Sequence, residues 1–287
     1  MSDRMSDGRH QPQTPPQFVE RITSLQNDRI KAVRALEMRK TRRETGLFVA
    51  EGAAVIISGR DHGIAPETLI VRRAGDDPST RMTEDLVTWA LAEGAEVLDV
   101  STPVMEKLVA KDNPQTLLAV YRQRWAPLPD PATITAEQTW LALEAIRDPG
   151  NLGTILRTAE AVGVSGLILA GNCCDPYARE AVRASMGSIF AVPLIKATDE
   201  DLLALMSRWP GDTVGTHLSS REDFRAAAYR HPALLVMGSE GPGLTDATTS
   251  ACSRLVKIPM SGKLDSLNLA IATALSLYQI RGGQLTI

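Results

Sequence analysis

Short apolar runs alternate with amphipathic segments from residue 18 to residue 122. A short apolar run bounded by polar residues predicts a strand, and apolar residues at helical spacing predict a helix. The predicted strands are 47–50, 68–71, 96–100 and 116–120. The predicted helices are 28–43, a helix that begins over 53–57, 83–93 and 102–109. This order predicts a small α/β sandwich.

The same alternation resumes at residue 139 and continues to the end of the chain. The predicted strands are 140–145, 166–170, 192–195, 213–217, 234–237 and 255–258. The predicted helices are 151–162, 177–186, 199–207 and 267–280, with Asn151 and Ser266 as the N-caps of the first and the last. Strands and helices in alternation predict a mostly parallel sheet covered by helices.

Prolines at 127, 129 and 131 mark a stiff linker over residues 123–138. We therefore expect two domains, over 18–122 and 139–287. Residues 1–17 are polar and proline-rich and lack an apolar signal segment, which predicts a disordered tail and a cytoplasmic protein.

The final predicted helix is apolar almost all round, which indicates burial on more than one side, by the core or by a partner subunit. It begins at a strand–loop–helix junction with a hydroxyl, an amide and unpaired backbone N–H groups. Such a junction suits an anionic or polar small ligand. On spacing alone, the alternative that Ser266 merely caps the helix remains open.

Composition narrows the class of protein. A hydrophobic fraction of 44% beside 23% charged residues is typical of a soluble globular chain. No apolar run approaches the roughly 18 residues of a membrane helix, so no membrane association is expected. The three cysteines and four histidines lack the spacing of metal ligands, so no metal is expected.

The net charge of −3 excludes a globally basic nucleic-acid-binding protein, but cations are concentrated between residues 29 and 43. That segment contains seven Lys and Arg residues against one Glu. Such a cluster is a candidate phosphate-contacting surface, and the alternative is a solvated helix face. The candidate RNA-contacting residues are Arg39, Lys40, Arg42 and Arg43.

Three loops that follow predicted strands carry unusual residues, at the edge where open α/β sheets bind ligands. The first is DPGNLG, with Arg157 downstream; this side chain could reach back over the loop or form an exposed ion pair with Glu160. The second is GSEGPG, whose glycines permit close approach to a ligand, or which is an ordinary connection capped by Thr245. The third precedes Ser266. None is a P-loop or a dinucleotide fingerprint, so the residues alone indicate a ligand-binding α/β protein.

Four segments in order resemble the motifs of the SpoU/TrmH family of SPOUT RNA methyltransferases: DPGNLGTILRTAEAVGVSGLIL, RASMGSIFAVPL, LLVMGSEGPGL and IPMSGKLDSLNLAIATAL. They cover essentially all of the second predicted domain. NDRIKAVRALEMRKTRRETGLFVAEG resembles, over a shorter stretch, the ribosomal-protein-like substrate-binding domain of that family. Departures are mild: Leu269 stands where many members carry valine, and Ser239 where many carry asparagine.

The resemblance implies a C-terminal α/β knot, in which the mostly parallel sheet is trefoil-knotted. It also implies a smaller N-terminal domain, a ribosomal-protein-like α/β sandwich. It also implies a homodimer with its active site at the subunit interface, S-adenosylmethionine held in the knot loops, and methyl transfer to a ribose 2′-hydroxyl of RNA. By motif position, Gly238, Ile258 and Leu267 would grip the cofactor through their backbones. The polar active-site set would be Asn151, Arg157, Glu240, Ser266 and Asn268.

The expected roles differ among these side chains. Arginine is always protonated in proteins, so we expect Arg157 to stabilise the developing alkoxide and a phosphate rather than to act as a base. Asn151 and Asn268 would position the ribose or hold the loops, and Glu240 would either order the site or accept a proton.

Ribosomal RNA is favoured over tRNA, because family members that act on tRNA often lack a ribosomal-protein-like domain. The alternatives are the same chemistry on tRNA and a non-catalytic RNA-binding protein. A nucleotide-dependent oxidoreductase is disfavoured by the missing fingerprint.

Overall fold

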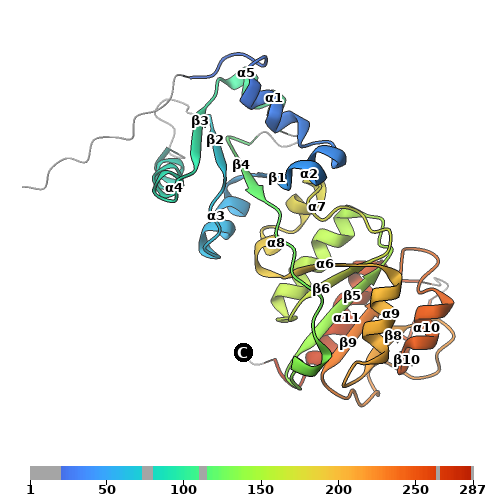
Figure 1. Cartoon of the computed structure of the whole chain (residues 1–287). Coiled ribbons are helices and arrows are strands. Elements are labelled where there is room, and N and C mark those ends of the chain that lie inside the picture. Colours follow the sequence, from blue (N-terminus) through green and yellow to red (C-terminus); the bar gives the residue numbers. More distant parts are fainter. Residues whose placement is uncertain (1–20, 73–79, 110–114, 263–265, 286–287) are drawn as a thin grey trace, which may run out of the picture.

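The structure is a computed structural model that describes residues 21–72, 80–109, 115–262 and 266–285. The tail predicted over residues 1–17 lies outside the described residues. The chain forms two sheets, one of four strands and one of six, which lie one after the other along the sequence (Figure 1). The N-terminal sheet and its helices are called here the N-terminal part, and the six-stranded sheet with its helices the C-terminal part.

The N-terminal part combines helices with a four-stranded sheet. Its elements are α1 (Asp28–Ala35), α2 (Arg39–Thr45), β1 (Leu47–Glu51), α3 (Ala53–Asp61), β2 (Thr68–Val71), α4 (Thr80–Ala92), β3 (Glu96–Asp99), α5 (Thr102–Leu108) and β4 (Leu117–Arg122). The strand order is β1-β4-β2-β3, in which β4 is antiparallel to both neighbours and β2 is parallel to β3. Successive strand residues face opposite sides: Phe48 and Ala50 belong to one core cluster, whereas Val49 belongs to another. All four predicted strands are confirmed within two residues.

The predicted helix 28–43 is wrong: α1 ends at Ala35 and α2 begins at Arg39. Arg42 stabilises the break, because its Nη1 donates hydrogen bonds to the carbonyl oxygens of Leu36 and Glu37 at 2.8 and 2.7 Å. Its Nε donates to Asp175 Oδ2 of the C-terminal part at 2.8 Å. Arg42 is only 5% exposed, so the prediction that it contacts RNA is corrected: it joins the two parts of the chain.

The C-terminal part is the predicted parallel sheet covered by helices. Its elements are η1 (Pro131–Thr133), β5 (Thr139–Glu144), α6 (Pro149–Ala161), β6 (Leu167–Ala170), α7 (Arg179–Ala184), α8 (Ser188–Ala191), β7 (Leu194–Ala197), α9 (Asp199–Ser207), β8 (Thr213–Thr216), β9 (Ala233–Met237), α10 (Asp246–Ala251), β10 (Arg254–Val256) and α11 (Leu269–Arg281). The strand order is β10-β8-β9-β5-β6-β7, and every pairing is parallel. The carboxyl ends of all six strands therefore lie at one edge.

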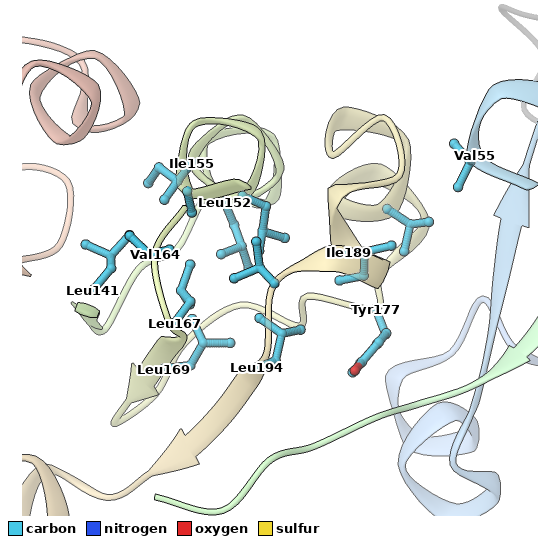
Figure 2. Packing of buried hydrophobic residues seen from close by; sticks show 14 of the residues in the cluster. Val55, Leu141, Leu152, Ile155, Val164, Leu167, Leu169, Tyr177, Ile189 and Leu194 are labelled. Atoms are coloured by element: carbon cyan, nitrogen blue, oxygen red, sulfur yellow. The ribbon is translucent and has the colours of Figure 1, made fainter. Parts of the chain in front are cut away.

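Both faces of this sheet are buried, as expected of a parallel sheet. On one face, Leu152 and Ile155 of α6 pack toward Leu167 of β6 and Leu194 of β7 (Figure 2). On the other face, α9 contributes to a separate core cluster that includes Trp140 and Trp209. The helices hold the sheet on two sides and leave its carboxyl edge to the connecting loops.

Two predicted N-caps are wrong. Asp148 rather than Asn151 caps α6, because its side chain accepts from the backbone N–H of Asn151, and Pro149 occupies the first turn. Asn268 rather than Ser266 caps α11, accepting from the N–H groups of Ala270 and Ile271. Both shifts matter for the site, since they determine which polar side chains remain available at these two helix starts.

The final helix is buried by its own chain on one side only. Its buried side includes Ala270, Leu277 and Ile280, but Ile271 and Tyr278 are each 52% exposed. With Leu275, these residues form an apolar stripe at i, i+4 and i+7. Burial on more than one side is thus not complete within a single chain.

Candidate active site

A cleft of about 510 Å³ lies at the carboxyl edge of the six-stranded sheet, beside the start of α11. Its volume is within the roughly 300–1,000 Å³ of small-molecule sites. Its walls come from the ends of β8 and β9, the loop after β9, the segment after β10 and the first turn of α11. Seven of the predicted site residues line it: Asn151, Gly238, Glu240, Ile258, Ser266, Leu267 and Asn268.

The loop after β9 is a tight turn built on glycines. The N–H of Ser239 donates to the carbonyl of Gly243 at 3.1 Å, and the N–H of Gly243 returns to the carbonyl of Ser239 at 3.0 Å. Gly241 and Gly243 have φ of 91° and 76°, values that favour glycine. A Cβ on Gly238 would lie 2.0 Å from the Gly243 carbonyl carbon, so only glycine fits there.

The far end of this loop is anchored by a residue that the sequence analysis missed. Glu144, at the end of β5, is 3% exposed. Its carboxylate accepts from the backbone N–H and the hydroxyl of Thr245, each at 2.8 Å, and from the Thr248 hydroxyl. The sequence feature that could have identified Glu144 is its position as a carboxylate at the end of the largely apolar strand TWLALE. Thr245 caps α10, as the alternative interpretation of GSEGPG had it.

Three predicted polar residues form one directed hydrogen-bond network. The Asn268 side-chain oxygen caps α11, so its Nδ2 is the donor toward Asn151 Oδ1, at 2.9 Å. Asn151 Nδ2 then donates to Glu240 Oε1 at 3.1 Å. Because Asp148 caps α6, the Asn151 amide is available for both contacts. The network connects three loops that the sequence analysis identified separately.

Glu240 accepts on both oxygens. Besides the Asn151 amide, the backbone N–H groups of Arg147 and Asp148 donate to it at 3.1 and 3.4 Å. Partial burial alone would raise its pKa, but these hydrogen bonds outweigh burial and the pKa of Glu240 lies below its usual value. A carboxylate with a lowered pKa is a poor proton acceptor, so the geometry favours an ordering role for Glu240 over a general base.

Replacing Glu240 with glutamine tests this ordering role. Glu240→Gln keeps one acceptor but turns an NH₂ group toward backbone N–H donors, so we expect about tenfold weaker cofactor binding by calorimetry. If Glu240 only orders the loop, saturating cofactor should restore most of the wild-type turnover, because the loss lies in binding. If turnover stays low at saturating cofactor, Glu240 acts in the chemical step and is a base instead. Ser239→Ala, in the same loop, is the matched control.

Arg157 lies elsewhere. It is an exposed residue of α6, six positions after Asn151, and six positions turn a helix by about 240°. Arg157 is not among the residues that line the cleft, so its guanidinium does not contribute to the cleft of its own chain. The alternative ion pair between Arg157 and Glu160 is not found among the described residues. Instead, Glu160 Oε1 lies 3.8 Å from His62 Nε2.

The remaining predicted residues are placed as follows. Ser266 is exposed at the mouth of the cleft, and Leu267 is 38% exposed. Arg39, Lys40 and Arg43 are exposed on α2, and Arg39 Nη2 donates to the carbonyl of Cys173 at 3.2 Å. The cleft also includes Thr216, His217, Lys257 and Met260, which the sequence analysis did not single out.

Metal-binding clusters and membrane-spanning helices are both absent from the described residues. No group of three or more His, Cys, Asp or Glu side chains among them could hold a metal ion. None of the helices formed by these residues has the length and apolar character required to span a bilayer.

Comparisons with known proteins cover both parts of the chain. Residues 138–278 match the sequence model of the SpoU rRNA Methylase family, and residues 27–119 match that of the MRM3-like substrate binding domain. The chain is 26% identical to 23S rRNA (guanosine(2553)-2'-O)-methyltransferase RlmP of Bacillus subtilis, over 92% of this chain and 100% of that protein. It is 31% identical to 23S rRNA (uridine(2479)-2'-O)-methyltransferase of Streptomyces viridochromogenes, over 90% of this chain and 91% of that protein.

A solved structure agrees with these relatives. The crystal structure of AdoMet-bound rRNA methyltransferase from Sinorhizobium meliloti matches with a TM-score of 0.83 at 39% identity, covering 93% of this chain and 99% of that one. The similarity therefore extends over nearly the full length of both chains.

Proposed function

The chain belongs to the SpoU rRNA methylase family, and on that basis we propose that it transfers a methyl group from S-adenosylmethionine to a ribose 2′-hydroxyl of ribosomal RNA. The observation that carries the proposal is the Glu240–Asn151–Asn268 network, which unites three motif loops around one cleft. Both relatives above are named as 23S rRNA 2′-O-methyltransferases, which supports rRNA over tRNA as substrate.

The cleft fits S-adenosylmethionine in size and chemistry. Its apolar walls, which include Ile258 and Leu267, suit the flat adenine, and backbone groups around Gly238 are available to its nitrogens. The ionised Glu240 gives the cleft a negative group that complements a sulfonium. When bound, this cofactor supplies an electrophilic methyl group. The residues of the chain would align the ribose oxygen in line with that group and stabilise the charge that develops on the oxygen as its proton passes to solvent.

A homodimer with the active site at its interface completes this proposal. The apolar stripe of α11 formed by Ile271, Leu275 and Tyr278 begins three residues after Asn268, so a second copy that covers the stripe would lie beside the cleft. Arg157 does not reach the cleft of its own chain. We therefore assign the arginine of each site to the second copy, where it stabilises the alkoxide and an adjacent phosphate.

The proposed fold of the C-terminal part is a trefoil knot. The path of the chain supports this proposal. Strand β10 lies at the edge of the sheet, next to β8, but the helix that follows it, α11, packs against α6 and β9 nearer the centre. The division at residues 123–138 and a cytoplasmic location remain predictions.

Calorimetric titration with S-adenosylmethionine tests the proposed function against its rival, a non-catalytic RNA-binding protein. We expect one binding site per chain and competition by S-adenosylhomocysteine. RNA binding without any heat from S-adenosylmethionine would support the rival instead.

A further inference from the structure

A second cavity, of about 1060 Å³, lies between α2 and the carboxyl ends of β6 and β7. Its volume is at the upper end of the roughly 300–1,000 Å³ of small-molecule pockets, so its lining rather than its size indicates the ligand. We call it the interdomain groove. Its cationic side chains are Arg39, Lys40, Arg43, Arg122 and Lys196. Five cationic side chains spread along one groove suit a polyanionic chain, which presents several phosphates in a row.

The acidic side chains of the groove are already engaged. Asp175 accepts from Arg42 at 2.8 Å, and Asp201 accepts from the backbone N–H of Thr198 at 2.9 Å in the capping box of α9. In contrast, no carboxylate of the described residues pairs with Arg43 or Lys196. These two cations, one from each part of the chain, are available to bind an anion.

Lys196 is held in place by an aromatic ring from the linker. Its Nζ lies 4.4 Å from the centroid of the Trp125 ring, a cation–π contact. The indole is fixed in turn, because its Nε1 donates to Gln123 Oε1 at 3.3 Å and Tyr177 packs edge-on at 5.3 Å. A ring face attracts the ammonium without neutralising its charge, so Trp125 positions a cation that still repels other cations and attracts phosphate.

The interdomain groove adjoins the cleft. Cys174, in the groove, donates its backbone N–H to the carbonyl of Ile146 at 2.7 Å. The next two residues, Arg147 and Asp148, donate theirs to Glu240 in the cleft. Groove and cleft therefore share the carboxyl edge of the sheet and are separated by one short turn.

We propose that the interdomain groove binds the RNA backbone next to the methylated nucleotide, with Arg43 and Lys196 as phosphate contacts. Trp125 is a positioning residue that acts through Lys196. The N-terminal and C-terminal parts then hold one RNA segment together, and the strand leaves the groove toward the cleft. This inference rests on the proposed function, since it names how the substrate reaches that site.

Salt-dependent binding of a fluorescein-labelled oligouridylate, measured by anisotropy, tests the groove, because backbone contacts do not depend on sequence. We expect Lys196→Gln and Arg43→Gln each to weaken binding and to reduce the salt slope by about 0.7, the share of one phosphate contact on a single strand. Arg208→Gln is the matched control: this exposed arginine follows α9 at the opposite, amino edge of the sheet, and should leave the slope unchanged.

A double-mutant cycle tests the role of Trp125. Trp125→Leu should weaken RNA binding in the wild-type background and have no further effect when Lys196→Gln is present. Equal effects in both backgrounds would show that Trp125 does not act through Lys196.

If the wild type does not bind the oligouridylate, or if the salt slope is unchanged in both cationic variants, the proposal that the groove binds RNA is contradicted. If the slopes change as expected but the wild type transfers no methyl group to RNA, the proposed function is contradicted and RNA binding by the groove is still supported.

Discussion

Arg157→Ala should abolish measurable turnover while the Kd for S-adenosylmethionine stays nearly unchanged. Removal of one group that stabilises a developing oxyanion lowers turnover by about 10²–10³-fold. We expect a larger loss for Arg157→Ala, because this arginine would also bind a phosphate. The guanidinium is exposed and lies outside the cleft of its own chain, so the cofactor pocket should not change. Single-turnover methylation and calorimetry measure the two quantities. Glu160→Ala, on the same helix, is the control.

Mixing two inactive variants shows which chain supplies the arginine. Arg157→Ala keeps an intact network, whereas Asn151→Asp places a carboxylate against Glu240 and keeps an intact arginine. If Arg157 acts across the dimer, a heterodimer of the two variants contains one complete site and regains activity. Mixed dimers without activity would contradict this assignment. Equal losses of turnover and cofactor binding in Arg157→Ala would show that its role is structural.

Gly238→Ala should have the second largest effect, on cofactor binding rather than on chemistry. The added Cβ would lie 2.0 Å from the Gly243 carbonyl carbon and 2.1 Å from the Leu244 nitrogen, both backbone atoms, so the loop must open. We expect calorimetry to show that the Kd for S-adenosylmethionine rises more than about tenfold, which corresponds to a loss of more than about 1.4 kcal/mol of binding free energy.

The matched control for Gly238→Ala is Gly241→Ala in the same loop. Gly241 has φ of 91° but nothing within 4 Å of an added Cβ, so its variant carries backbone strain without a collision. Similar Kd values for the two variants would show that strain, rather than the close approach at Gly238, explains the loss.

The fold followed from the sequence wherever a local pattern determines an element. The parallel order of the second half was predictable because buried strands such as 234–237 alternate with amphipathic helices. The break between α1 and α2 was not, because no glycine or proline marks it. What stabilises it is Arg42, which pairs with Asp175 from 133 positions away. Contacts between residues so far apart in the sequence cannot be predicted from the spacing of apolar residues.

The site was predictable to a similar extent. The motifs identified Asn151, Glu240 and Asn268, but their spacing did not show that they contact one another. Two N-caps were misplaced because several residues near each helix start can cap it, and the choice depends on what the other side chains bind. Glu144 was missed because a buried carboxylate becomes meaningful only once its threonine partners are known.

The central claim is that this chain methylates a ribose hydroxyl of RNA. Its most direct test incubates the purified protein with methyl-labelled S-adenosylmethionine and deproteinised ribosomal RNA from cells that lack the gene, then separates the nucleosides. We expect label in a 2′-O-methylnucleoside, and none with Arg157→Ala. Label on a nucleobase, or bound cofactor without transfer to RNA, would contradict it.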